Sequence, residues 1–152
     1  MTEHFTLVEL IRSDYAARHG IDNFPSPDIE ANLEILAMGL ERVRKVLGKP
    51  MQISSGYRSP KVNAAQGGSK SSYHMRGLAA DFHVSGMTTG DICRAIVAHK
   101  DEIQYDKVIS EFANSGGGWC HIQFPDVDAA PRLTAWTITD KQTGYREGIL
   151  NG

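Results

Sequence analysis

The stretch Ser72–Phe82 constrains the fold of this chain most, because it carries metal-ligand side chains that are useful only if they converge in space. It holds His74 and Asp81 with Gly77 between them, and His121 follows in a later apolar stretch. Two imidazoles and one carboxylate form the three-ligand set of a catalytic zinc site, in which a fourth position stays open for water. The fold must therefore bring His121 beside Asp81.

Two expected strands, Ala79–Val84 and Trp119–Phe124, provide a way to do this. Side chains alternate between the two faces of a strand, so the apolar members of each stretch share one face and point to the core. Asp81, His121 and Gln123 then lie on the opposite face, and pairing of the two strands would place Asp81 and His121 together. Gly77 allows the sharp backbone turn that brings His74 back toward them.

The whole pattern predicts an α+β fold, because helices come first and strands follow mostly without long crossovers, as in an antiparallel sheet. At 152 residues the chain fits one domain, 1–152. Capping residues and apolar periodicity predict helices at 6–18, 27–47, 61–65 and 88–99. Period-two alternation and turn residues predict strands at 51–54, 79–84, 106–111 and 119–124, and a terminal hairpin of 133–139 with 145–150.

Composition excludes several classes of function. The chain is 41% hydrophobic and 22% charged, with a net charge of −2, so we expect no nucleic-acid partner. No apolar run approaches the length of a membrane span, so no membrane partner is expected either. Met1–Phe5 lacks the layout of a signal peptide, and synthesis in the cytoplasm without one is expected. We expect a monomer.

Cys93 and Cys120 are the two cysteines of the chain. They could form one disulfide, but two isolated cysteines do not make a disulfide framework, and both fit small buried apolar positions. Cys120 neighbours His121 on the same expected strand, so the two side chains point to opposite faces. Cys120 is therefore a poor candidate for a metal ligand.

The pattern Ser72-x-His74-x-x-Gly77-x-Ala79-x-Asp81, followed by Trp119-x-His121-Ile122, resembles the zinc D-Ala-D-Ala carboxypeptidases, peptidase family M15. It is most similar to their small phage and bacterial members. The turn 54–60 also resembles the arginine-bearing turn of that family. The resemblance implies the hedgehog/DD-peptidase fold, a central antiparallel sheet flanked by helices. It also implies one zinc ion, with His74, Asp81 and His121 as its ligands.

The resemblance implies roles for two more side chains. Arg58 would bind a substrate carboxylate or stabilise the tetrahedral oxyanion, since a guanidinium is always charged and forked. Ser72 would help to hold the substrate near the metal. A surface arginine in a turn is the alternative interpretation of Arg58.

A peptidase of this kind also needs a general base that accepts a proton from water, and the position of this residue differs from the family pattern. Several members place a glutamate three residues before the last histidine or a histidine two before it, where this chain has Gly118 and Trp119. Glu111 is the best remaining candidate, because it ends an expected strand that a short loop joins to the strand of His121. A surface charge at a strand end is the alternative for Glu111. His83 is a second candidate base or an outer partner of the metal site.

Together with the metal-ligand pattern, the resemblance implies a zinc-dependent peptidase that hydrolyses an amide bond in the peptide stem of peptidoglycan. D-Ala-D-Ala carboxypeptidase and L-Ala-D-Glu endopeptidase activities both remain open, and a phage endolysin is one setting. Such an enzyme would reach the cell wall through a phage lysis partner or as part of a virion. The alternatives are a non-catalytic, metal-bearing module that binds cell wall or belongs to a phage particle, and a zinc amidase with another substrate.

Overall fold

The computed structural model describes residues 1–150, apart from the side chain of Ser115. The expectation of one domain over 1–152 stays a prediction, and its last two residues lie outside the described part. The helices are α1 (Leu7–Ile11), α2 (Asp14–Arg18), α3 (Pro27–Leu47), α4 (Pro60–Ala65), α5 (Thr89–Ala98) and α6 (Lys100–Ile103), with two 3-10 turns, η1 (Tyr73–Arg76) and η2 (Ala113–Ser115). The strands are β1 (Gln52–Ser55), β2 (Ala79–His83), β3 (Lys107–Glu111), β4 (Trp119–Gln123), β5 (Thr134–Ile138) and β6 (Tyr145–Glu147).

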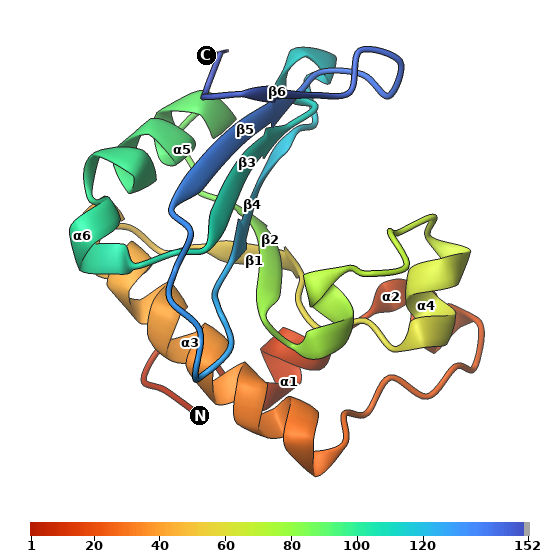
Figure 1. Cartoon of the computed structure of the whole chain (residues 1–152). Coiled ribbons are helices and arrows are strands. Elements are labelled where there is room, and N and C mark those ends of the chain that lie inside the picture. The colour runs from red at the N-terminus through yellow and green to blue at the C-terminus, as the bar shows by residue number, and fades with distance from the viewer. Residues whose placement is uncertain (151–152) are drawn as a thin grey trace.

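One six-stranded sheet, in the order β1-β2-β4-β3-β5-β6, organises the molecule. Helices α3, α5 and α6 lie to one side of it, and α1, α2, α4 and η1 gather near its β1–β2 edge (Figure 1). The α+β class predicted from the sequence is confirmed. The strands also follow the predicted ranges closely, including the terminal hairpin of β5 and β6.

The sheet departs from the expected antiparallel arrangement at one pairing. β3 pairs with β5 in parallel, whereas the other pairings are antiparallel. The chain leaves β4, passes the start of β3 through the segment 124–133, and begins β5 where Thr134 pairs with Lys107. β5 therefore runs in the same direction as its neighbour β3 and opposite to β4, and the sheet is mixed.

The first predicted helix, 6–18, is wrong in one respect, because the chain forms two short helices there. Arg12 is extended, with φ −62° and ψ 130°, and ends α1. Ser13 then caps α2, since its Oγ accepts a hydrogen bond from the backbone N–H of Ala16 at 3.1 Å. A serine at such a position satisfies a free N–H at a helix start and so favours a new helix over continuation.

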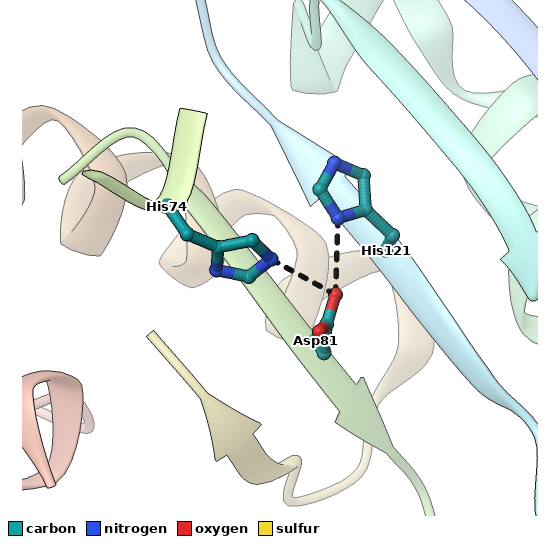
Figure 2. A group of neighbouring side chains, drawn as sticks. All are labelled: His74, Asp81 and His121. Carbon is teal, nitrogen blue, oxygen red and sulfur yellow. Dashed lines mark hydrogen bonds and ion pairs between the residues drawn. The ribbon is translucent and has the colours of Figure 1, made fainter. Parts of the chain in front are cut away.

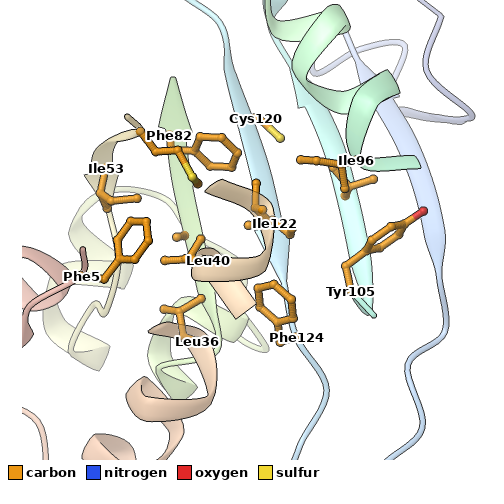
Figure 3. Packing of buried hydrophobic residues seen from close by; sticks show 14 of the residues in the cluster. Phe5, Leu36, Leu40, Ile53, Phe82, Ile96, Tyr105, Cys120, Ile122 and Phe124 are labelled. Carbon is orange, nitrogen blue, oxygen red and sulfur yellow. The ribbon is translucent and has the colours of Figure 1, made fainter. Parts of the chain in front are cut away.

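Helix α3 agrees with its prediction and supplies much of the core. Ser26 caps its start and Gly48, at φ 67°, ends it in the left-handed conformation. Its buried face includes Leu36 and Leu40, which pack with residues of the sheet and α5 (Figure 3). The labelled core residues of Figure 3 are Phe5, Leu36, Leu40, Ile53, Phe82, Ile96, Tyr105, Cys120, Ile122 and Phe124.

The same strands that bury Phe82, Cys120 and Ile122 turn Asp81 and His121 to the other face, as alternation predicts. The core thus fixes the backbone on which the polar face is built. Within residues 1–150, no helix has the length and apolar character required to cross a membrane.

Candidate metal centre

The side chains of His74, Asp81 and His121 converge on the face of the sheet opposite the hydrophobic core. His74 comes from η1, Asp81 lies in the middle of β2, and His121 is its direct partner on β4. Asp81 Oδ1 lies 3.3 Å from His74 Nε2 and 3.0 Å from His121 Nδ1 (Figure 2). The three residues are 3%, 5% and 9% exposed, and one ligand-type atom from each lies within 4.8 Å of the others.

The turn before β2 orients His74. Ser72 Oγ accepts the backbone N–H of His74 at 3.2 Å and begins η1, and Gly77 ends η1 in the left-handed conformation at φ 71°. His74 Nδ1 lies 2.7 Å from the carbonyl oxygen of Gly56. A carbonyl can only accept, so Nδ1 carries the proton and Nε2 presents its lone pair toward Asp81.

Arg58 holds the second oxygen of Asp81. Its Nη2 donates to Asp81 Oδ2 at 3.1 Å, and its Nε donates to Ser55 Oγ at 3.0 Å. Burial alone raises the pKa of the Asp81 carboxyl, but His74 and His121 beside it outweigh burial and hold the pKa well below its usual range. Asp81 is therefore a carboxylate, with Oδ1 directed at both imidazoles.

His121 is oriented from both of its ring nitrogens. Nδ1 faces Asp81 Oδ1, and Nε2 lies 3.0 Å from Gln123 Oε1. Burial lowers the pKa of His121, but the bond to Asp81 and the charges of Asp81 and Glu111 outweigh it and raise the pKa overall. At His74, burial outweighs Asp81 and lowers the pKa. The surroundings of His121 thus favour its protonated form, whereas those of His74 favour its neutral form.

Glu111 stands beside these three residues, as the sequence predicted. The short loop after β3 lets β3 and β4 pair, and Glu111 is opposite Trp119 in the register. Glu111 Oε2 accepts a hydrogen bond from Trp119 Nε1 at 2.9 Å and lies 3.9 Å from His121 Nδ1. Burial raises the pKa of Glu111 above its ordinary value. A carboxylate in such surroundings is suited to accept and return a proton.

The other predicted site residues differ in what they contact. Arg58 lies at the centre, but its guanidinium is engaged by Asp81 and Ser55, and its contact with a substrate stays a prediction. The observed contact of Ser72 is the cap on η1, so it positions His74, and its substrate role also stays a prediction. His83 is exposed, and among residues 1–150 no hydrogen bond or ion pair joins it to the three converging residues.

Sequence reasoning missed the outer partners of the histidines. Alternation placed Gln123 on the site face, two residues after His121, but gave it no role. Gly56 was assigned only to a turn, although its carbonyl orients His74. Asp106 was treated as a strand residue, although it is 2% exposed and bonded to Gln123. The position of Gln123 beside a candidate ligand was the one local signal for this network.

The donor set fits a metal ion. Two imidazole nitrogens and one carboxylate oxygen face each other, and each residue's other donor or acceptor atom is engaged by Gly56, Arg58 or Gln123. Nitrogen and oxygen ligands of this kind suit zinc. With the Glu111 carboxylate 3.9 Å from His121 Nδ1, this donor set has the composition of a metal-dependent hydrolase centre.

Comparison with known proteins assigns the family. The family model described as Peptidase M15 matches residues 3–113, which is more than half of the chain. This chain therefore belongs to the M15 peptidases, a family of metallopeptidases that use zinc. The matched range includes Arg58, Ser72, His74, Asp81 and Glu111, whereas His121 lies beyond it.

Relatives that share one name are similar to part of this chain. The peptidoglycan L,D-endopeptidase MepK of Escherichia coli K12 is 39% identical over 66 residues, and the alignment covers 39% of this chain and 36% of MepK. MepK of Shigella flexneri matches with the same identity and coverage. The similarity thus spans little more than a third of the length of these relatives.

Proposed function

We propose that this chain is a zinc peptidase that cleaves an amide bond in the peptide stem of peptidoglycan. The observation that carries the proposal is the convergence of His74 Nε2, Asp81 Oδ1 and His121 Nδ1, with the carboxylate of Glu111 beside them. Family membership supports the reaction class, and the name of the MepK relatives supports the substrate class.

His74, Asp81 and His121 would hold one zinc ion. When bound, zinc supplies a Lewis acid that polarises a carbonyl and lowers the pKa of water. The work of this chain is to keep each ligand atom free and oriented. The Gly56 carbonyl accepts a hydrogen bond from His74 Nδ1–H, and Arg58 Nη2 donates one to Asp81 Oδ2. These contacts leave His74 Nε2 and Asp81 Oδ1 as the atoms that face the metal position.

Glu111 is the proposed general base. Its burial raises its pKa and makes it a better proton acceptor than an exposed glutamate. It would accept a proton from the attacking water and return it to the leaving amine. The bond from Trp119 Nε1 fixes one oxygen of Glu111 and leaves the other for this transfer.

Arg58 would serve the reaction from beside Asp81. Because Asp81 and Ser55 already engage it, we assign it first to holding the ligand carboxylate and second to stabilising negative charge that develops on the substrate carbonyl. A guanidinium engaged in this way is a poor anchor for a free C-terminal carboxylate. This favours an endopeptidase of L,D type over a carboxypeptidase, in keeping with the MepK name.

Incubation with defined stem peptides, read by mass spectrometry, tests the proposal. One peptide should end in D-Ala-D-Ala, and one should be an internally linked stem with an L,D amide. We expect cleavage of the L,D amide, about one zinc per chain by metal analysis, and no cleavage by His121→Ala. Binding of intact peptides without cleavage over long incubation would support the alternative of a metal-bearing wall-binding module.

The biological setting is part of the proposal. We propose a monomer that acts on the cell wall after release by a phage lysis partner or delivery in a virion. Lysis of peptidoglycan sacculi by added protein, with and without membrane permeabilisation of whole cells, tests this. Equal lysis of intact cells without permeabilisation would contradict the need for a release partner.

A further inference from the structure

The side chain of Gln123 lies between His121 and a buried carboxylate. Gln123 Oε1 is 3.0 Å from His121 Nε2, and Gln123 Nε2 donates to Asp106 Oδ2 at 3.1 Å. Gln123 is 5% exposed and Asp106 2%, so water does not compete for either contact. The amide thus connects the imidazole of a candidate ligand to a group that touches neither His74 nor Asp81.

Arg132 holds Asp106 in the charged form. Arg132 Nε and Nη2 donate to the two oxygens of Asp106 at 2.9 and 2.6 Å, and its backbone N–H donates to Oδ1 at 3.1 Å. Paired donors from one guanidinium fix the plane of a carboxylate as well as its charge. Arg132 belongs to the segment between β4 and β5, so that segment is tied to the start of β3.

These contacts determine which way each group must point. An ionised carboxylate can only accept hydrogen bonds, so the amide nitrogen of Gln123 must face Asp106. The amide oxygen must then face His121, and it too can only accept. Nε2 of His121 must therefore carry a proton, which leaves Nδ1 as the nitrogen available to a metal ion.

We propose that Arg132, Asp106 and Gln123 form a positioning relay that fixes the ring orientation of His121 and reserves its Nδ1 for the metal ion. The relay rests on the metal-binding part of the proposed function. The relay includes Arg132 from the segment 124–133, which lies outside the range matched by the family model. Gln123 is a positioning residue, since it acts on the metal only through His121.

Zinc affinity, measured by competition with a chelator, tests the relay in the full-length chain. Gln123→Leu keeps the approximate volume and removes both contacts, and we expect zinc affinity to fall about 10- to 100-fold. Thr137→Val is the matched control, because Thr137 is also buried in the sheet and donates to the carbonyl of Gly148 at 2.7 Å. The control should lose stability but keep its zinc affinity.

A proton resonance provides a second readout that a purely structural role would not change. In the zinc-loaded wild type and Thr137→Val, the Nε2–H of His121 should give a slowly exchanging imidazole signal by NMR. Gln123→Leu should lose that signal or exchange it rapidly. Unchanged zinc affinity together with an unchanged signal in Gln123→Leu would overturn the relay.

Arg132→Gln keeps the test decisive if Gln123→Leu does not fold. The Arg132 side chain is 55% exposed, so its replacement should be tolerated, and loosening Asp106 should weaken zinc binding several-fold. Wild-type affinity in this variant would also contradict the relay. Failure of the wild type to bind zinc at all would instead remove the proposed function, so the two failures are distinguishable.

Discussion

Asp81 and His121 face each other directly across β2 and β4, with His121 Nδ1 3.0 Å from Asp81 Oδ1. Each is the central residue of its strand, and each strand is hydrogen-bonded to a neighbouring strand along both of its edges. A pair of residues placed in this way is rigid, because moving either backbone would break the register of several strands. The third residue, His74, comes from a short turn, and Ser72, Gly56 and Gly77 hold it.

Replacing Glu111 by glutamine should separate catalysis from metal binding. The amide cannot accept the proton, so we expect kcat to fall about 10²- to 10⁴-fold. Zinc content should stay near that of the wild type, since the three ligand atoms are untouched. Stem-peptide cleavage and metal analysis on the same samples provide the measurement.

Glu41→Gln is the matched control for that experiment. Glu41 lies on α3 and accepts hydrogen bonds from the backbone and ring of His4, far along the chain from the metal centre. Its loss should leave kcat unchanged. Full activity in Glu111→Gln would reassign the general base.

Asp106 should make stability depend on pH in the acidic range. Burial raises its pKa, but the hydrogen bonds from Arg132 and Gln123 outweigh burial, so the pKa in the folded protein lies below the ordinary 3.8. The unfolded chain therefore binds a proton first as the pH falls, and the contribution of Asp106 is complete above 3.8 and lost as the pH falls through the lowered folded value. Asp106→Asn should be less stable than wild type at neutral pH.

Chemical denaturation at a series of pH values checks this expectation. The difference in unfolding free energy between wild type and Asp106→Asn should shrink as the pH falls from about 5 toward 2. A constant difference would show that the carboxylate does not contribute through its charge.

Alanine substitution of two glycines should distinguish a loss of stability caused by overpacking from a loss of zinc affinity. A Cβ on Gly56 would lie 2.2 Å from the carbonyl oxygen of Leu10, and a Cβ on Gly39 would lie 2.4 Å from the ring of Phe124. Alanine at either position should destabilise the protein by about 1–3 kcal/mol through overpacking. Only Gly56→Ala should also weaken zinc binding, because the Gly56 carbonyl orients His74.

Denaturant unfolding and chelator competition on both variants supply the two readouts. Equal zinc affinities in Gly39→Ala and Gly56→Ala would contradict the role given to the Gly56 carbonyl. Gly39 is a suitable comparison because it lies on α3, in the core on the other face of the sheet.

Cys93 and Cys120 should be unreactive thiols in the native protein. Both are fully buried, their sulfur atoms lie 3.3 Å apart, and burial raises the pKa of Cys120 well above its ordinary value. Reactivity depends on the thiolate and on access, and both are disfavoured here. A thiol-reactive dye should modify neither cysteine in the folded chain and both after denaturation; fewer than two reactive thiols in the unfolded chain would indicate a disulfide.

Much of the site was predictable from local patterns. Strand alternation is a property of the backbone, so it placed Asp81, His121 and Gln123 on one face and Cys120 and Ile122 on the other. Helix α3 was predictable for a similar reason, because its cap, apolar stripe and terminal glycine act within a few residues of each other. The break between α1 and α2 was missed, since Ser13 could serve equally as a helix interior residue or a cap.

By itself the sequence determined the residues of the centre, the faces on which they lie and the α+β class of the fold. Only the tertiary structure decided that β5 runs parallel to β3, that Arg58 binds Asp81, and that Arg132 reaches His121 through Asp106 and Gln123. The physical reason is the range of the interactions. Caps and alternation act between near neighbours. Apart from the contact of Gln123 with His121, the contacts that only the tertiary structure decided join segments far apart along the chain, and these leave no local pattern.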